Sequence, residues 1–322
     1  MNEKLIRTQF NQIETTEKQA LMESLATRYD MTFLGLHTFD RWGQSCTTGI
    51  FQKDSRKFVF VPGDTVTLGW EQFAIGLNPD SQEELDYLIR EWEMECDPNE
   101  MIRESMAPVR QATISPMLVG RKLEELCWEP IKIDDPRLTA HPDWLEKFRD
   151  FAWSDLDSLT LHQSVRIERT EKGFQICIYN QMDYDSLMKQ MEKQGLSLPT
   201  ADEWAYLCGG GCRTLFPWDD GMDYSMHLHH FESSEDEDKP FDMEEPNFFG
   251  LSIAYDPYMR EIVKADVFTT CGGDGGRSIC GGLGIFLGFL PCSPHCKPEV
   301  QENKQLNGDY DFCRPIIRVE TD

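Results

Sequence analysis

A short helix bounded by strong start and stop signals constrains the fold of this chain more than any other feature. The segment "LPTADEWAYLCGGGC" places Thr200 at the N-cap and Glu203 three residues later, which is the pattern of a capping box. The glycines at 209–211 end this helix after few turns. Trp204 and Trp218 supply large apolar surfaces close by. We therefore interpret the helix as a structural keystone in a region that is poor in regular structure.

The N-terminal part of the sequence predicts a helix followed by three short strands. Apolar residues recur at helical spacing over 16–29, and Thr16 and Gln19 form another capping-box pattern. β-branched and aromatic residues then gather in three stretches that Gly, Asp and Ser residues separate, which favours an antiparallel meander. The three stretches are 31–41, 46–54 and 56–64.

A second helix is predicted to begin at Ser81, with Glu84 in the capping-box position. Its apolar residues form one stripe, which we expect to pack on the sheet. The stripe consists of Leu85, Leu88, Ile89, Trp92 and Cys96.

The second half of the chain mixes strands, helices and loops. Alternating residues over 165–180 predict a hairpin, and a helix is expected over 183–194. After Pro246 the chain has many glycines and few periodic patterns, so we expect long irregular loops until a strand within 313–320. The predicted class is α+β, loop-rich, with short antiparallel strands and a few helices.

Charge and cysteine content limit the classes of function. The chain of 322 residues carries 57 acidic and 31 basic residues, a formal net charge of −26 that repels nucleic acid and anionic lipids. Acidic residues are densest near 232–245, which predicts a solvated loop, with a cation or basic-partner site as the alternative. We find no apolar run of signal-peptide or membrane-span length, and expect the 11 cysteines to be reduced thiols in the cytoplasm.

Four separated blocks, taken in order, resemble the formylglycine-generating enzyme family, whose domain is a variant of the C-type lectin fold. The most specific block is "LSLPTADEWAYLCGGGCRTLFPWDDG", because the family combines Leu-Pro-Thr, Glu-Trp and a glycine-rich break before an aromatic-Pro-Trp motif. The resemblance implies a C-type-lectin-like domain over 55–322, with 1–54 as an extension packed on it. The blocks are 58–70, 108–125, 196–221, and 247–257 with the glycine-rich stretch and 313–319.

The resemblance also implies a copper site in catalytically active members, built from two cysteine thiolates with four residues between them. Cys280 stands near the first position, but Ile285 occupies the second. No two cysteines of this chain have that spacing, so we expect the copper pair to be absent and Cys280 to be a buried structural thiol. A second branch of the family uses a three-histidine iron site, and the seven histidines here lack the His-x-x-x-His spacing that it needs.

Other metal sites stay open as alternatives. Cys208 and Cys212 have zinc-like spacing, as do Cys292 and Cys296, which enclose His295. We favour structural roles for all of them.

The histidines of "HLHH" (227–230) are interpreted as a solvated loop cluster rather than an adventitious metal site. Calcium is implied by the family resemblance, and Asp256 and Glu261 are candidate oxygen ligands. The simpler interpretation is a pair of surface carboxylates.

The stretch "TTCGGDGGRSICGGLGIFLGFLPCSPHC" (269–296) lacks a phosphate-loop motif, and its residues 275–278 resemble the family's Gly-Gly-Ser turn.

The sequence leaves two hypotheses for the function of the chain. The first is a non-catalytic binding or scaffold protein, whose negative surface favours a basic protein partner. The alternative is a copper- and thiol-dependent oxidase with rearranged thiolates from Cys271, Cys280, Cys292 or Cys296.

Overall fold

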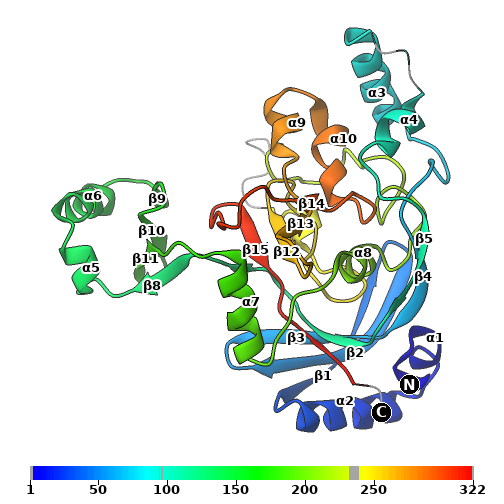
Figure 1. Ribbon diagram of the computed structural model, residues 1–322, viewed down its shortest axis with the longest axis horizontal. Helices are drawn as coiled ribbons and strands as arrows, with labels where there is room; N and C mark the ends of the chain where they lie inside the picture. Colours follow the sequence, from blue (N-terminus) through cyan, green and yellow to red (C-terminus); the bar gives the residue numbers. More distant parts are fainter. Residues whose placement is uncertain (1–2, 94, 96, 232–238, 321–322) are drawn as a thin grey trace.

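The computed structural model describes residues 3–93, 95, 97–231 and 239–320, and its class is mixed α+β, as predicted. A five-stranded sheet of order β1-β2-β3-β6-β16 forms its base (Figure 1). All neighbouring strands of this sheet are antiparallel, and β1 to β3 form the predicted meander. The strands are β1 (Thr32–Arg41), β2 (Gln44–Lys53), β3 (Arg56–Val61), β6 (Met117–Gly120) and β16 (Ile316–Arg318). The expected domain boundary at residues 54 and 55 falls in the turn between β2 and β3.

The first long helix, α2 (Thr15–Arg28), covers one side of β1 and β2 (Figure 1). The helix is confirmed, but the capping box predicted at Thr16 and Gln19 is wrong. Glu14 is the N-cap and makes no side-chain cap hydrogen bond. Burial of the apolar face, which includes Met22 and Leu25, stabilises the helix instead. The short elements η1 (Glu3–Leu5) and α1 (Arg7–Phe10) precede it.

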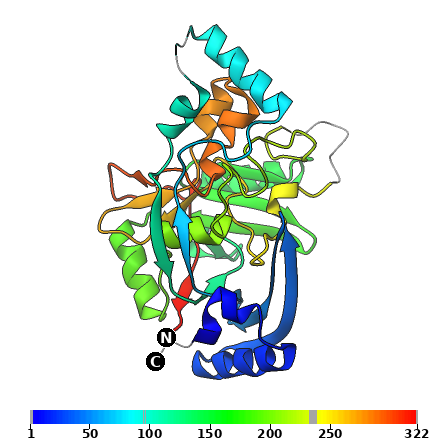
Figure 2. The same cartoon turned by 90° about the vertical axis from the view of Figure 1, so that its right-hand side faces the viewer.

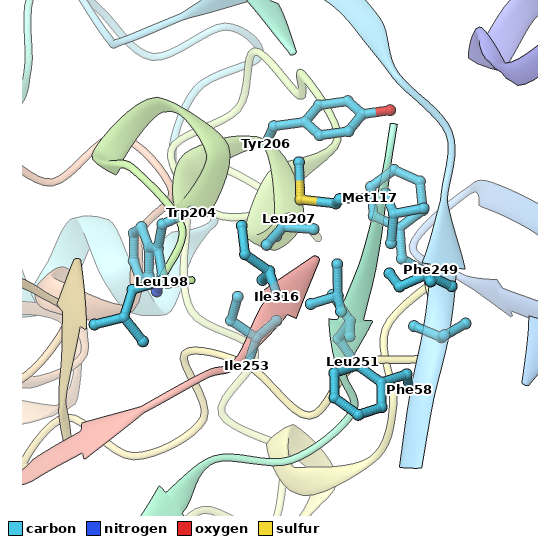
Figure 3. Close-up of a cluster of buried hydrophobic side chains, with 14 of the residues drawn as sticks. Phe58, Met117, Leu198, Trp204, Tyr206, Leu207, Phe249, Leu251, Ile253 and Ile316 are labelled. Carbon is cyan, nitrogen blue, oxygen red and sulfur yellow. The ribbon is translucent and has the colours of Figure 1, made fainter. Parts of the chain in front are cut away.

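The keystone helix α8 (Ala201–Gly209) lies at the centre of the molecule, as Figure 1 shows. Both hydrogen bonds of the predicted capping box are present, and Gly210 ends the helix with a φ of 60°. Trp204, Tyr206 and Leu207 all point into the main core, where they meet residues of the sheet and of the loop after residue 246 (Figure 3). A helix of this length is held by such packing and not by its own propensity.

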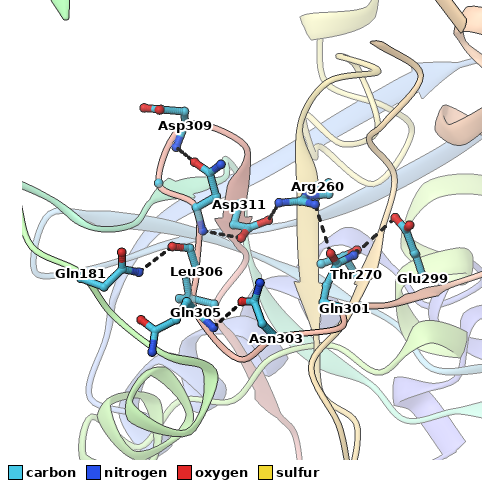
Figure 4. A network of polar contacts seen from close by, with 12 residues as sticks. Gln181, Arg260, Thr270, Glu299, Gln301, Asn303, Gln305, Leu306, Asp309 and Asp311 are labelled. Atoms are coloured by element: carbon cyan, nitrogen blue, oxygen red, sulfur yellow. Dashed lines mark hydrogen bonds and ion pairs between the residues drawn. The ribbon is translucent and has the colours of Figure 1, made fainter. Parts of the chain in front are cut away.

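A second five-stranded sheet, of order β14-β13-β12-β15-β7, lies beside α8. Its strands β12 and β15 run parallel, and an ion pair between half-buried Arg260 and buried Asp311 joins them with a nitrogen–oxygen distance of 2.7 Å (Figure 4). The strands are β7 (Glu124–Glu125), β12 (Arg260–Val263), β13 (Thr269–Cys271), β14 (Glu299–Val300) and β15 (Asp311–Cys313). Strands β4 (Asp64–Leu68) and β5 (Arg110–Ile114) form a separate antiparallel pair.

The second predicted helix begins earlier than expected and packs elsewhere. It is α3 (Pro79–Glu91), and the side chain of Asn78 caps it by accepting the N–H of Ser81. Leu85 and Leu88 are buried, but Trp92 lies beyond the helix and is 61% exposed. The packing partner is α10 (Gly284–Gly288) and not a sheet, so that expectation was wrong. Cys96 lies outside the described residues; α4 (Pro98–Arg103) follows.

A smaller unit projects from the main body at the left of Figure 1 and has its own core. The predicted hairpin is confirmed as β10 and β11, which sit in a four-stranded sheet of order β8-β11-β10-β9. The elements of the unit are β8 (Trp128–Ile131), α5 (Pro136–Thr139), α6 (Pro142–Ala152), β9 (Ser158–Leu161), β10 (Val165–Thr170) and β11 (Gly173–Tyr179).

The predicted helix over 183–194 is confirmed as α7 (Tyr184–Lys193), which Asp183 caps.

The glycine-rich stretch holds more regular structure than expected. Besides β13 it forms α9 (Gly276–Cys280), α10 and η3 (Leu290–Cys292), and Figure 2 shows α9 and α10 beneath α3.

The predicted terminal strand is split, because Pro315 separates β15 from β16. Of the acidic loop, 232–238 lies outside the described residues, while η2 (Asp242–Glu244) follows it. Within the described ranges, no helix has the length and apolar character that a membrane crossing requires.

Candidate functional site

Cys280, the first candidate among the four thiols of the oxidase alternative, is exposed at the end of α9. The expectation of a buried structural thiol was therefore wrong. Its neighbour is the hydroxyl of Tyr258, which lies 3.3 Å from the Cys280 Sγ atom. This contact is the main cause that raises the pKa of Tyr258 to about 12. Ile285 lies on α10 and packs in the apolar cluster under α3.

Tyr258 also connects Cys280 to a carboxylate and an imidazole. The backbone N–H of Tyr258 donates to the Asp256 Oδ1 atom at 2.8 Å, and His230 Nε2 lies 3.1 Å from the same oxygen. The rings of His230 and Tyr258 are 4.4 Å apart. A thiol beside a phenol offers one soft ligand, whereas the Cu(I) site that the family resemblance implies needs two thiolates. The residues around Cys280 therefore do not fit the implied copper pair.

The remaining cysteines of the glycine-rich stretch gather near the end of α8, where Cys271 and Cys292 are buried and Cys296 is partly exposed. Burial raises the pKa of Cys271 and Cys292 well above the usual thiol value, and raises that of Cys296 to about 12. Cys208 lies among them, with its Sγ atom 3.7 Å from the carbonyl oxygen of Cys292. A buried thiol that resists deprotonation is a poor metal ligand. Across the described ranges, no group of three or more His, Cys, Asp and Glu side chains is placed to hold a metal ion.

Cys271 faces a small cavity, which it lines together with Trp204 and Glu261. The cavity measures about 10 Å³, at the lower limit for a single water molecule. The indole nitrogen of Trp204 is buried without a hydrogen-bond partner. This cavity is too small for a substrate that would have to reach the Cys271 thiol.

His295, which the sequence places between Cys292 and Cys296, is 1% exposed. Its Nε2 atom lies 3.0 Å from the carbonyl oxygen of Thr214 and 3.9 Å from the Sγ atom of Cys212. Burial is the main cause that lowers the pKa of His295 to about 4. The side chain is therefore a neutral hydrogen-bond donor to a loop carbonyl at neutral pH, which agrees with a structural role.

This burial predicts a stability change on mild acidification. The pKa of His295 is lower in the folded chain than in the unfolded chain, so the unfolded state binds more protons as the pH falls from about 6.5 toward 4. As the pH falls from 7 to 5, protonation of His295 in the unfolded state should lower the free energy of unfolding by about 2 kcal/mol. Urea unfolding of wild type and His295→Gln at both pH values checks this. The variant, whose amide keeps a donor for Thr214, should lose less stability on acidification, and an equal loss would contradict the prediction.

The three histidines of the "HLHH" segment reach different partners. His227 Nδ1 lies 3.1 Å from the carbonyl oxygen of Pro240, and His229 Nε2 lies 4.0 Å from the Glu244 carboxylate. His230 contacts Asp256, as described above. The rings therefore do not converge on one point, as a metal site requires.

The carboxylates considered for calcium are not surface groups, contrary to expectation. Asp256 is nearly buried, and Glu261 is 2% exposed. The Arg314 Nε atom lies 2.9 Å from Glu261 Oε1, so a buried guanidinium already neutralises this carboxylate. Asp256 is engaged by His230 and by the Tyr258 backbone. These two side chains therefore do not fit a shared calcium site.

A basic groove, which we did not expect from the sequence, lies where the β2–β3 turn meets the chain after β6. Its volume is about 720 Å³. Arg121 forms part of its lining, with Lys57 and Lys122 beside it. The other lining residues are Ser55, Arg56, Gly120, Leu123, Glu124, Glu125, Glu244, Pro246 and Ser252. We refer to this set as the basic groove.

Arg121 is held in place by both its backbone and its side chain. Its N–H donates to the Lys57 carbonyl, and its own carbonyl accepts from Ser252, both at 3.0 Å. The side-chain Nε donates to the Gly250 carbonyl at 2.9 Å, and the guanidinium carbon lies 5.2 Å from the centre of the Phe39 ring. Desolvation lowers the pKa of Arg121. A motif search could not find this residue, because its fixed position depends on contacts from distant parts of the chain.

A scan against models of protein families and a search of curated proteins both found nothing that matches this chain.

Proposed function

We propose that this chain is a non-catalytic binding or scaffold protein, built on a formylglycine-generating-enzyme-like domain with a C-type-lectin-like fold. The proposal rests on one contrast: the keystone helix matches the resemblance, whereas the thiols do not form the copper pair that the resemblance implies. The capping box of Thr200 and Glu203 is formed and Trp204 is buried, which supports the resemblance of this block. The Cys280 thiol, by contrast, faces a phenol where a second thiolate would be needed.

The partner that we propose is a basic protein. A net charge of −26 attracts a positively charged surface and speeds the encounter, while affinity depends on local contacts. We place this role in the cytoplasm. The ten described cysteines are free thiols, which suits a reducing compartment.

Copper titration under anaerobic conditions tests the proposal against the oxidase alternative. We expect no stoichiometric Cu(I) complex, because the buried thiols favour the protonated form and Cys280 has a phenol, and no second thiolate from the described residues, beside it. The measurement is competition with a chromogenic Cu(I) chelator. One tightly bound Cu(I) per chain that is lost in Cys280→Ser would overturn the proposal and support the oxidase.

Thiol counting on the same samples controls for misfolding. Among the described cysteines Cys280 is the exposed one, so one fast-reacting thiol should disappear in Cys280→Ser. The Tyr258→Phe variant keeps the aromatic ring and removes the hydroxyl that contacts the Cys280 Sγ atom. It should retain the fast-reacting thiol, and its loss would show that the region around α9 has rearranged.

A further inference from the structure

We propose that the basic groove binds a small phosphorylated ligand, with the Arg121 guanidinium as its main anchor. The inference deepens the proposed binding role and rests on it. It adds a ligand class opposite in charge to the basic protein partner. No part of it depends on the cysteines.

The charges of the groove are unequally compensated. Arg56 is neutralised by Glu124, whose two oxygens lie 2.6 and 3.0 Å from its guanidinium nitrogens. Glu125 is likewise paired with Arg166 outside the groove. Arg121, in contrast, has a carbonyl oxygen and an aromatic ring as partners, and no carboxylate among the described residues.

Two lysines add to this uncompensated charge. Lys57 and Lys122 both line the groove and are exposed, and within the described ranges neither forms an ion pair. Glu244 is the third acidic residue of the lining, and His229 Nε2 lies 4.0 Å from its carboxylate. Of the four cationic residues that line the groove, three therefore have no carboxylate partner among the described residues, in a protein whose net charge is −26. A local positive site on a negative protein is a specific feature and not a result of overall composition.

The guanidinium of Arg121 is positioned in advance of binding. Its Nε–H is already used by the Gly250 carbonyl, while the Phe39 ring covers one face. Gly250 can approach so closely because it has no side chain: a Cβ atom there would lie 2.5 Å from the Phe39 ring. The free NH₂ groups can then donate to an oxyanion with little further loss of side-chain entropy.

The size and charge of the groove favour a small phosphate ester. A volume of about 720 Å³ is in the range of small-molecule sites. A phosphate monoester carries nearly two negative charges, which matches an arginine and two lysines better than a single carboxylate does. Ser55 and Ser252 also line the groove, and serine offers neutral donors. A long polyanion such as nucleic acid would meet the negative surface beyond the groove.

Isothermal titration of the full chain with inorganic pyrophosphate, and with citrate as a carboxylate of comparable charge, tests the inference. We expect pyrophosphate to bind more tightly than citrate, and Arg121→Gln to weaken it at least tenfold. The matched control is Arg277→Gln, which removes an exposed arginine on α9 that is paired with Asp274. The control should bind like wild type.

A second variant keeps the test valid if Arg121→Gln fails to fold. The double substitution Lys57→Gln and Lys122→Gln changes two exposed side chains, and should weaken pyrophosphate binding at least threefold and flatten its salt dependence. Absence of pyrophosphate binding to wild type, an equal loss in the control, or tighter binding of citrate would each overturn the inference. Those results would leave the copper titration unchanged, so failure of the groove and failure of the proposed function can be told apart.

Discussion

Replacing Arg314 by methionine should lower the free energy of unfolding by about 3–5 kcal/mol, because it leaves a buried carboxylate without its counter-ion. Arg314 is 0% exposed, and it donates to both oxygens of Glu261, at 2.9 and 3.2 Å. It also donates to the carbonyls of Gly120 and Ser252, each at 2.7 Å. The substitution would therefore leave three acceptor groups without their donor.

Urea unfolding at pH 7 measures this loss in the free energy of unfolding, and two further variants serve as comparisons. The double variant Arg314→Met with Glu261→Leu removes the stranded carboxylate and should recover part of the stability. Arg137→Met removes solvent-exposed ion pairs with Glu129 and Asp135 and should cost far less stability than Arg314→Met. A loss of similar size in Arg137→Met and Arg314→Met would contradict the argument from burial.

Alanine at Gly275 should destabilise the protein by about 3 kcal/mol, the upper end of the usual cost of overpacking. A Cβ atom at this position would lie 2.0 Å from the carbonyl oxygen of Gly288 and 2.8 Å from Pro257. The φ of Gly275 is −63°, which alanine adopts without strain, so the expected effect is purely steric. Thermal and urea unfolding of Gly275→Ala provide the measurement.

Gly282→Ala is the matched control in the same stretch. A Cβ atom at Gly282 would meet no other atom within 4 Å, but the φ is 74°, so alanine there should cost only about 1 kcal/mol of backbone strain. If both variants lose the same stability, the close contact between α9 and the end of α10 is not what requires glycine at 275. The pair thus separates two reasons for the glycine content of this segment.

The elements predicted well from the sequence are those that local signals define. The capping box of Thr200 and Glu203 needs four neighbouring residues, and the hairpin at 165–180 needs only alternation around a turn. The packing partner of α3 was predicted wrongly, because helical spacing shows which side of a helix is apolar and not which element covers that side. Its partner proved to be α10, which is distant in the sequence.

The candidate site was harder to predict, because its properties come from long-range contacts. Glu261 has the same sequence character as a surface carboxylate until Arg314 is placed beside it. Cys280 was expected to be buried among apolar neighbours, yet α9 presents it to solvent beside Tyr258. Arg121 carries no motif at all. Its fixed position needs a ring from β1 and a carbonyl from Gly250.

The position of β16 in the base sheet has a consequence for folding during synthesis. β16 covers the edge of β6, although it is made long after β1, β2, β3 and β6 have left the ribosome. Until then the nascent chain displays an open strand edge, which is a site for mispairing with other chains. Chaperone protection should therefore matter most after β6 has been made and before β16 has been made, and pairing of β16 with β6 should end that need.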